Sequence, residues 1–505
     1  MKRRTVLTGL AAAAGAAAGL GLPATARAAG PAPFDLDAYE VLETTIATAS
    51  GDRVVRYHFW RAVPYVAAPV DVRYQSLNIS VPVKIDGRAV DARQAPILFA
   101  TAVAGYLPSS VADATGIGGG ATSSPPPGTD DPGETPEPAP EQPREVSTAE
   151  LALAAGYVVV EPGARGRTLV DEAGVHHGTA PAAIVDLKAA VRYLRANKGR
   201  VPGDPDRIVA TGAGAGGGLS ALLGASGDSP LYEPYLRRLG AAAASDAVFA
   251  AAAHSPVTDL EHADLAYEWC WGDLPTETGE TVDPDVTQDL RMGFADHLAE
   301  LDLTGRDGFG PLTAATYDDY LLRAYLRPAA AAYVNGLPEG DRPAALDASP
   351  VLADPAFTWS AFQQHVGSRR KGAPAFDALD LSAPENNEFG TGTIPARHFT
   401  TYSLRRASGN EYARLDADLD AKLTLMNPMP FLTARHAGRA RHWWLRTGTR
   451  DTETSLTTMT NLATAAENAG DDVDARMYWD AGHGADEDAP AFLTWLAGVT
   501  GYPQR

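Results

Sequence analysis

The amino-acid sequence predicts an α/β protein with a doubly wound, mostly parallel sheet and a large helical insertion. Short apolar runs alternate with amphipathic helical stretches in the first half of the chain, and this alternation returns after residue 430. Between these parts, residues 259–430 form helix-like segments punctuated by prolines. Because strand–helix–strand units give parallel strands joined by right-handed crossovers, we expect one sheet from residues 29–258 and 431–505, with residues 259–430 as a lid.

The first part of this core is expected to begin with an antiparallel edge. Residues 54–60 and 77–83 alternate apolar and polar side chains, as half-buried strands do. Residues 96–100 and 157–160 are continuous apolar runs, which are typical of central parallel strands covered on both faces. Pro181 then begins a helix whose apolar residues recur at helical spacing.

Later segments complete the predicted sheet. We expect strands at residues 207–212, 247–253, 442–446 and 475–479. A helix with one apolar face, around residues 456–466, separates the last two strands.

One internal segment has a different composition. Residues 116–143 consist mainly of glycine, proline, serine, threonine and acidic residues, which cannot bury enough apolar area to fold. Because strands resume after it, we expect this segment to be a disordered loop inserted in the core and not a domain boundary.

The composition excludes several classes of function. The chain of 505 residues has a net charge of −21, so it repels nucleic-acid phosphates and we expect no nucleic-acid partner. The single cysteine, Cys270, can form no intrachain disulfide and is too few for a zinc–cysteine cluster. His176 and His177 are adjacent, chelate one ion poorly and have no carboxylate at ligand spacing, so we expect no metal and no cofactor.

The N-terminus has the features of an export signal. Arg3 and Arg4 precede a short apolar run rich in alanine and glycine, and Ala26 and Ala28 form an Ala-x-Ala cleavage site. We interpret residues 1–28 as a twin-arginine signal peptide, with a plain secretory signal as the alternative. Because no other segment reaches about 18 uninterrupted apolar residues, the mature protein is expected to be extracytoplasmic without stable membrane association.

A glycine-rich turn after the strand at 207–212 is the centre of the predicted site. Gly212, Gly214 and Gly216 join this strand to an apolar helix and form the frame of the Gly-x-Ser-x-Gly nucleophile elbow of α/β-hydrolases. Gly214 stands at the serine position, so the nucleophile is absent. Two alternatives stay open. One is a dinucleotide-binding fingerprint that runs from Gly212 to Gly217, although the sequence lacks the strand ending in an acidic residue that should follow it. The other is a tight turn without a site.

Two later residues fit the other members of a catalytic triad. Asp451 and His483 each follow one of the last two predicted strands. The order of nucleophile position, acid and histidine is that of the α/β-hydrolases, in which the acid and base lie in loops after late strands. A solvated aspartate and a hydrogen-bonded structural histidine are the alternative for each residue alone.

Three further segments are informative, namely Gly163–Thr168, Leu219–Tyr235 and Ser255–Trp269. They resemble bacterial tannases of subtype B, which are secreted α/β-hydrolases that cleave galloyl esters and are neighbours of the feruloyl esterases. The resemblance implies an α/β-hydrolase fold with a lid over most of the mature chain outside residues 116–143. The chain also departs from the family, which has Thr and Ser where Ala213 and Gly214 stand.

The same resemblance implies the residues that hold the substrate. Lys371, Glu385 and Glu453 occupy the places of the lysine and two acids that grip the phenolic hydroxyls of a galloyl group, with Glu453 where the family has Asp. Three adjacent hydroxyls that donate and accept can be satisfied by one ammonium and two carboxylates. Ordinary surface charges are the alternative. The expected oxyanion hole consists of backbone amides of Ala104, Gly105 and Ala215.

These features predict a secreted tannase-like protein with a site for a polyhydroxybenzoyl ester or acid. Three functions stay open. In the first, a water in the space left at Gly214 hydrolyses the ester after His483, oriented by Asp451, activates it. In the second, the chain binds the phenolic compound without cleaving it, and in the third, the Asp451–His483 pair takes a phenolic proton in a non-hydrolytic reaction.

Overall fold

The computed structural model describes residues 30–119, 121–122, 146–434, 436–484 and 486–505. The predicted signal peptide, residues 1–28, lies outside the described residues, as does most of the predicted loop 116–143. Of that loop, Ile117 is buried and the Gly118 amide donates to the carboxylate of Glu161, while β7 (Ala121–Thr122) pairs with β6 (Ser109–Ser110).

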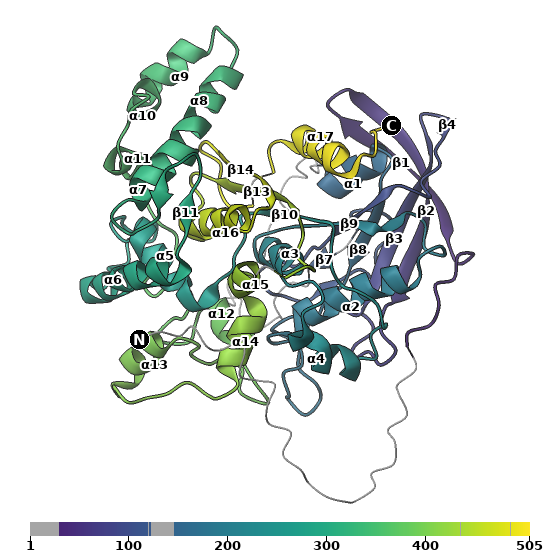
Figure 1. Ribbon diagram of the computed structural model, residues 1–505, viewed down its shortest axis with the longest axis horizontal. Helices are drawn as coiled ribbons and strands as arrows, with labels where there is room; N and C mark the ends of the chain where they lie inside the picture. The colour runs from purple at the N-terminus through teal and green to yellow at the C-terminus, as the bar shows by residue number, and fades with distance from the viewer. Residues whose placement is uncertain (1–29, 120, 123–145, 435, 485) are drawn as a thin grey trace, which may run out of the picture.

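A sheet of ten strands forms the centre of the molecule (Figure 1). Its order is β1 (Glu40–Thr48), β2 (Gly51–Pro64), β3 (Ser76–Ile85), β8 (Val158–Pro162), β5 (Pro96–Ala100), β9 (Asp204–Ala213), β10 (Ala250–His254), β13 (His442–Gly448) and β14 (Asp472–Tyr478), with β4 (Arg88–Ala89) beside β3. From β8 to β14 all neighbours are parallel, whereas β1, β2 and β3 pair antiparallel and β3 meets β8 antiparallel. The predicted fold class, a mostly parallel doubly wound sheet with an antiparallel edge, is confirmed.

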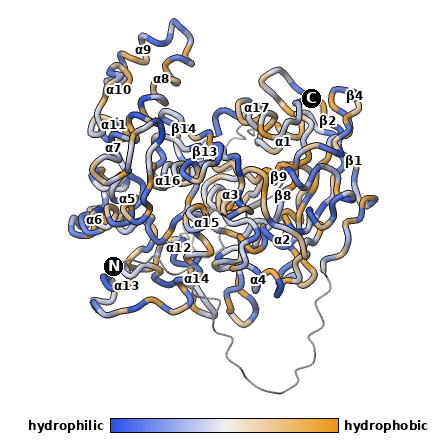
Figure 2. Tube along the Cα trace, in the orientation of Figure 1, coloured by the Kyte–Doolittle hydropathy of each residue, from blue (hydrophilic) through white to orange (hydrophobic). Residues whose placement is uncertain are grey.

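Helices of the core cover both faces of this sheet. α1 (Thr148–Ala154) contacts α17 (Ala489–Thr500), and α2 (Ala182–Ala196) contacts α3 (Ala215–Ala225). α16 (Leu456–Asn468) packs on β13 and β14, and a short α4 (Glu233–Arg238), preceded by the single turn η1 (Pro230–Tyr232), lies against α2. The apolar colour in Figure 2 is concentrated along the central strands, where the buried core lies.

β3 differs from the half-buried strand that the alternating pattern predicts. Its polar residues Ser76, Asn78 and Ser80 are as buried as the apolar residues between them. α1 packs on this strand, and the Asn78 side chain donates to the Val111 carbonyl and accepts from the Ala62 amide. The polar face of β3 is therefore buried against protein and not exposed to water. The backbone supplies partners for Asn78, whereas the Ser76 and Ser80 hydroxyls have no hydrogen-bond partner among the described residues.

The lid contains all the elements between α4 and β13 that do not belong to the sheet. They are α5 (Leu260–Trp271), α6 (Pro284–Leu301), α7 (Tyr317–Leu321), the π-helical turn η2 (Leu322–Leu326), α8 (Arg327–Gly336), α9 (Arg342–Ala348), α10 (Pro350–Ala353), α11 (Trp359–Val366), α12 (Pro384–Glu388), α13 (Thr401–Ser408), α14 (Leu419–Met426), α15 (Met429–Ala434) and the hairpin β11 (Thr304–Gly305) and β12 (Gly310–Pro311). In Figure 1 these green elements lie beside the C-terminal half of the sheet. No helix in the described part of the chain is long and apolar enough to cross a bilayer.

Candidate active site

Gly214 lies at the sharp turn between β9 and α3. Its φ of 56° and ψ of −123° belong to a region that side-chain-bearing residues enter only under strain, as the serine of a nucleophile elbow does. The turn is tight because a Cβ on Gly212 would stand 2.6 Å from the Gly216 carbonyl oxygen. The structure therefore has the elbow geometry that the glycine frame predicts, with no side chain at its apex.

His483 and Asp451 form a hydrogen-bonded pair beside this elbow. His483 Nδ1 lies 3.0 Å from Oδ1 and 3.1 Å from Oδ2 of Asp451, which is buried. The Thr447 hydroxyl donates to Asp451 Oδ2 at 3.1 Å, and the Glu453 amide donates to Oδ1 at 3.1 Å. Three donors thus fix the carboxylate, and the carboxylate orients the imidazole with Nε2 directed away from it.

The charges around His483 raise its pKa. Burial alone lowers the pKa of the imidazole, but the hydrogen bond and negative charge of Asp451 outweigh it and Glu453 adds to them. Lys371 acts in the opposite direction. Two of the residues predicted to hold the substrate therefore lie within electrostatic range of the predicted base.

The imidazole of His483 is also packed against the elbow. A Cβ on Gly214 would stand 2.9 Å from Nε2 of His483, which is closer than real Cβ contacts. The His483 side chain is 31% exposed, so its other side remains open to solvent.

The predicted oxyanion residues come from two segments that meet at α3. A Cβ on Gly216 would lie 2.7 Å from the Val103 carbonyl oxygen, so the residues before Ala104 and Gly105 pass directly over the first turn of α3. Ala215 is the first residue of that helix, where amides have no partner within the helix. The structure thus brings Ala104, Gly105 and Ala215 into one region.

A tyrosine of the lid, Tyr267, joins the backbone of Lys371 to the residue that precedes Glu453. The Tyr267 hydroxyl accepts from the Lys371 amide at 3.1 Å and donates to the Thr452 carbonyl at 2.7 Å. The Lys371 ammonium lies 3.9 Å from the centre of the Phe376 ring, and Glu453 pairs with Arg370 at 2.7 Å. Arg370 was not among the predicted site residues, although it precedes Lys371 in the sequence.

Glu385 lies on a different side of the site. It is buried in α12, its Oε2 atom has no hydrogen-bond partner among the described residues, and its charge acts on Tyr106 and Arg167. Arg167 donates to the Gly105 carbonyl at 2.8 Å and to the Asn387 side chain at 3.2 Å, so α12 adjoins the oxyanion segment. Within the described residues, no hydrogen bond or ion pair joins Glu385 to Lys371 or Glu453.

A second carboxyl of α12 is also buried. Glu388 is fully buried, and burial raises its pKa well above the ordinary value, while Arg167 and Lys422 oppose the shift and Glu385 adds to it. Burial thus favours the neutral form of the Glu388 carboxyl.

Comparisons with known proteins match this arrangement. The BD-FAE family model matches residues 141–270. The tannase of Fusobacterium nucleatum is 31% identical, with 93% of this chain and 99% of that chain covered and a TM-score of 0.77. The tannin acyl hydrolase of Lactobacillus plantarum is 34% identical, with 93% of this chain and 98% of that chain covered and a TM-score of 0.74.

The chain belongs to the tannase family. Tannin acyl hydrolase structures in complex with ethyl gallate and with 3,4-dihydroxybenzoate are each 34% identical to it, with TM-scores of 0.74 and 0.75 over 93% of this chain and 98% of theirs. Esterase LipQ of Mycobacterium tuberculosis is 41% identical over 90 residues, which are 18% of this chain and 20% of that esterase. The family assignment therefore rests on the tannase structures, because the match to the esterase covers about a fifth of that esterase.

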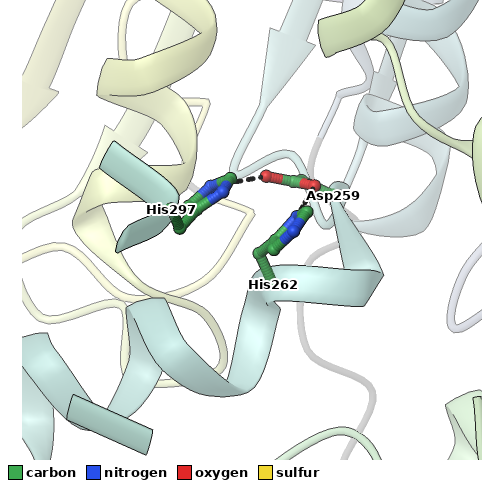
Figure 3. Close-up of side chains that lie close together, drawn as sticks. All are labelled: Asp259, His262 and His297. Carbon is green, nitrogen blue, oxygen red and sulfur yellow. Dashed lines mark hydrogen bonds and ion pairs between the residues drawn. The ribbon is translucent and has the colours of Figure 1, made fainter. Parts of the chain in front are cut away.

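This tannase-family chain also has a cluster that sequence reasoning missed (Figure 3). Asp259 Oδ1 accepts from His262 Nδ1 at 2.8 Å and from the Asn427 side chain at 2.6 Å, and Oδ2 lies 3.1 Å from His297 Nε2. Potential metal-ligand atoms of Asp259, His262 and His297 all lie within 4.8 Å of one another. No short motif signals the cluster, because α6 brings His297 to it from a distant part of the sequence.

The orientation of the two imidazoles decides how this cluster is built. Their rings stack with centroids 3.9 Å apart and planes 12° from parallel. A metal bound to an imidazole lies near the plane of that ring, and an ion in the plane of one of these rings would stand far out of the plane of the other. With this orientation the cluster is a hydrogen-bonded junction that joins α5, α6 and the end of α14. It lies close to the two ends of the lid in the sequence.

Proposed function

We propose that this chain binds galloyl or related polyhydroxybenzoyl esters and hydrolyses them slowly without a serine nucleophile. The observation that carries the proposal is the intact Asp451–His483 pair, placed directly against an elbow whose apex is Gly214. Support for the ligand class comes from the family, in which tannin acyl hydrolase is known in complex with ethyl gallate and 3,4-dihydroxybenzoate. In finer detail we place the chain with the subtype B tannases, with glycine in place of the elbow serine.

In the proposed reaction a water molecule replaces the serine hydroxyl. Because His483 fills the elbow side, the water approaches Nε2 from the exposed side of the ring. His483 takes a proton as the water oxygen bonds to the ester carbonyl carbon, and Asp451 stabilises the imidazolium. The tetrahedral oxyanion accepts hydrogen bonds from amides of the Ala104–Gly105 segment and Ala215. Its collapse breaks the ester C–O bond, and the imidazolium returns the proton to the leaving alkoxide.

The phenolic ring is proposed to lie between the two groups of charged residues described above. Lys371 and Glu453 stand on the His483 side, and Glu385 stands on the side of the oxyanion segment. The unpartnered Glu385 oxygen supports this placement, because a buried carboxylate oxygen without a hydrogen bond is costly and a phenolic hydroxyl supplies the missing donor.

A second candidate function is binding without turnover. It is favoured by the same packing of His483 on the elbow, because Nε2 lies 2.9 Å from the place that a Cβ on Gly214 would occupy, which leaves little room for a water between the ring and the elbow. Loss of a triad nucleophile costs about 10⁶ in turnover, so a protein of this fold can keep its binding site after hydrolysis is lost.

We also propose that the protein acts outside the cytoplasm after export of the folded chain. The support is the paired Arg3 and Arg4 before an apolar run and an Ala-x-Ala site. Separately, the net charge of −21 disfavours a nucleic-acid partner.

One experiment separates the two candidate functions. The protein is incubated with methyl gallate, and gallate release is followed beside His483→Ala, while calorimetry measures gallate binding to both. Release that depends on His483 supports the water mechanism. Binding of gallate with no release above the His483→Ala rate leaves the binding function, and absence of both overturns the proposal.

A further inference from the structure

The last residue of β10 and the three residues after it hold both polar backbone groups of Gly214. The Gly214 amide donates to the His254 carbonyl at 2.9 Å, and the Val257 amide donates to the Gly214 carbonyl at 3.0 Å. Both polar groups of the Gly214 peptide are thus bound to residues 254–257. The position of the elbow apex therefore depends on this four-residue segment.

The same segment is bonded to the oxyanion side. The Tyr106 hydroxyl is buried and donates to the Val257 carbonyl at 2.9 Å. Tyr106 follows Gly105 directly and has a positive φ of 56°. This bond fixes the residue next to the predicted oxyanion amides relative to the elbow.

Ser255 connects the segment to both members of the Asp451–His483 pair. Its Oγ accepts from the Gly484 amide at 2.9 Å, next to His483, and lies 3.3 Å from the Thr447 hydroxyl. Because the Thr447 hydroxyl gives its proton to Asp451 Oδ2, Ser255 is the donor in the Ser255–Thr447 contact. One buried hydroxyl therefore binds the chain beside the base and, through Thr447, the acid.

The backbone of Ser255 supports a specific role. Its φ of 44° lies in the left-handed region, and its amide donates to the Arg446 carbonyl at 2.6 Å on the neighbouring strand β13. Left-handed backbone in a buried residue that is not glycine persists only where surrounding bonds require it, and such positions concentrate at functional sites.

We propose that Ser255 is a positioning residue that sets His483 and Asp451 relative to the Gly214 elbow through Gly484 and Thr447. Its catalytic consequence rests on the proposed ester hydrolysis, whereas its effect on His483 does not. Ser255 touches no substrate in this role. Without its hydroxyl, the His483 loop and the Asp451 carboxylate lose their shared anchor, and the imidazole is no longer held close to both carboxylate oxygens.

Two variants interrupt, at different points, the chain of hydrogen bonds that runs from Ser255 through Thr447 to Asp451. Ser255→Gly deletes the hydroxyl and accepts the positive φ without strain, and Thr447→Val deletes the second hydroxyl with nearly the same shape. Thr447→Ser keeps the hydroxyl and is the conservative rescue. Thr464→Val is the matched control, because Thr464 is buried in α16 and bonds to the Tyr320 hydroxyl away from the site.

The readout that a purely structural role would not move is the titration of His483, followed by NMR on the full chain and assigned with His483→Ala. In Ser255→Gly and Thr447→Val, the pKa of His483 falls toward its ordinary value because the bond to Asp451 loosens. Thr447→Ser and Thr464→Val titrate as the parent. Hydrolysis of methyl gallate falls at least about tenfold in the first two variants, since misplacement by about 1 Å costs up to about 10² in rate.

The outcomes are decisive in either direction. Unchanged His483 titration in folded Thr447→Val and Ser255→Gly overturns the proposal, and so does an equal shift in Thr464→Val. If Ser255→Gly does not fold, Ser255→Ala takes its place, because Thr447→Val also removes the direct bond of Thr447 to Asp451 and cannot test Ser255 alone. If the parent hydrolyses no galloyl ester, the proposed function fails while the titration still tests Ser255.

Discussion

Nε2 of His483 lies 2.9 Å from the place that a Cβ on Gly214 would occupy. A serine at this position needs the ring to withdraw by a few tenths of an ångström, so that its hydroxyl can lie within hydrogen-bond distance of Nε2. The ring is partly exposed and held mainly through Nδ1, so this movement is small and possible. This close contact therefore limits the activity that a serine introduced at position 214 can recover.

Gly214→Ser should raise hydrolysis of a galloyl ester at least about 100-fold. The acid, base, elbow turn and oxyanion amides are all in place, and the gain stays below the full factor of about 10⁶ because His483 must first move. Initial rates with methyl gallate measure the effect. Gly214→Ala is the control, since it adds the same Cβ without a hydroxyl and should give no gain. A folded serine variant that binds gallate but is no faster than Gly214→Ala would exclude a hydrolase site.

Glu453→Gln and Lys371→Met should shift the pH dependence of hydrolysis in opposite directions. The base must be neutral, so activity is lost as pH falls through the raised pKa of His483. Glu453 raises that pKa, so its removal moves the acid limb to lower pH, and Lys371 lowers it, so its removal moves the limb to higher pH. Rate profiles between about pH 5 and 9 test this. Shifts of the same sign in both variants would contradict the assignment of His483 as the base.

Lys371→Ala should weaken gallate binding about tenfold or more. Truncation leaves a buried phenolic hydroxyl unpaired, which costs about 1 to 3 kcal/mol. Calorimetry compares this variant with Lys84→Ala, which removes an exposed lysine of β3 far along the chain. The parent should also prefer gallate to benzoate. Equal affinity for these two acids would refute a clamp for phenolic hydroxyls.

The Asp259–His262 ion pair should make the stability of the protein fall as pH rises above neutrality. Burial lowers the pKa of His262, but the charge and hydrogen bond of Asp259 outweigh it and raise the pKa from 6.5 to about 9. Because the folded pKa is the higher one, the ion pair contributes fully below about pH 6.5 and is lost as pH rises toward 9. The Tm of the parent should fall over this range more than that of His262→Gln. Parallel Tm curves would show that the pair is not charged in the folded protein.

Replacement of Arg3 and Arg4 by lysine should retain the protein in the cytoplasm. The twin-arginine translocase reads the guanidinium pair, which lysine does not reproduce. Arg27→Lys, in the same segment but outside the pair, should leave export unchanged. Fractionation of cells expressing each variant measures the effect, and full export of the double variant would favour a plain secretory signal.

Periodicity and order predicted the core well because the signals are local. The apolar run Pro96–Ala100 is β5 over the same residues, and the helix after Pro181 is α2. The pattern failed at β3, where polar residues read as solvent-facing are buried against neighbouring backbone. Whether a polar side chain meets water or a carbonyl depends on tertiary packing, which periodicity does not contain.

The predicted site shows the same limit. The order of Gly214, Asp451 and His483 and their places after strands were enough to predict that they meet, since carboxyl ends of parallel strands share an edge. The Ser255 and Thr447 hydroxyls and the stacked His262 and His297 had no such signal. They meet because loops and lid helices from distant parts of the chain pack together, and no spacing in the sequence records that packing.

The bond between Asp259 and Asn427 has a consequence for how such proteins diversify. These residues stand near the entrance and exit of the lid, and they touch at 2.6 Å. The entropic cost of closing an inserted segment grows only slowly with its length, by about 0.6 kcal/mol for each doubling. Exchange of everything between these two positions would leave the β10 and β13 connections in place. We therefore expect that the lid can be exchanged for a shorter or differently shaped one, while the sheet and the edge that carries Gly214, Asp451 and His483 stay constant.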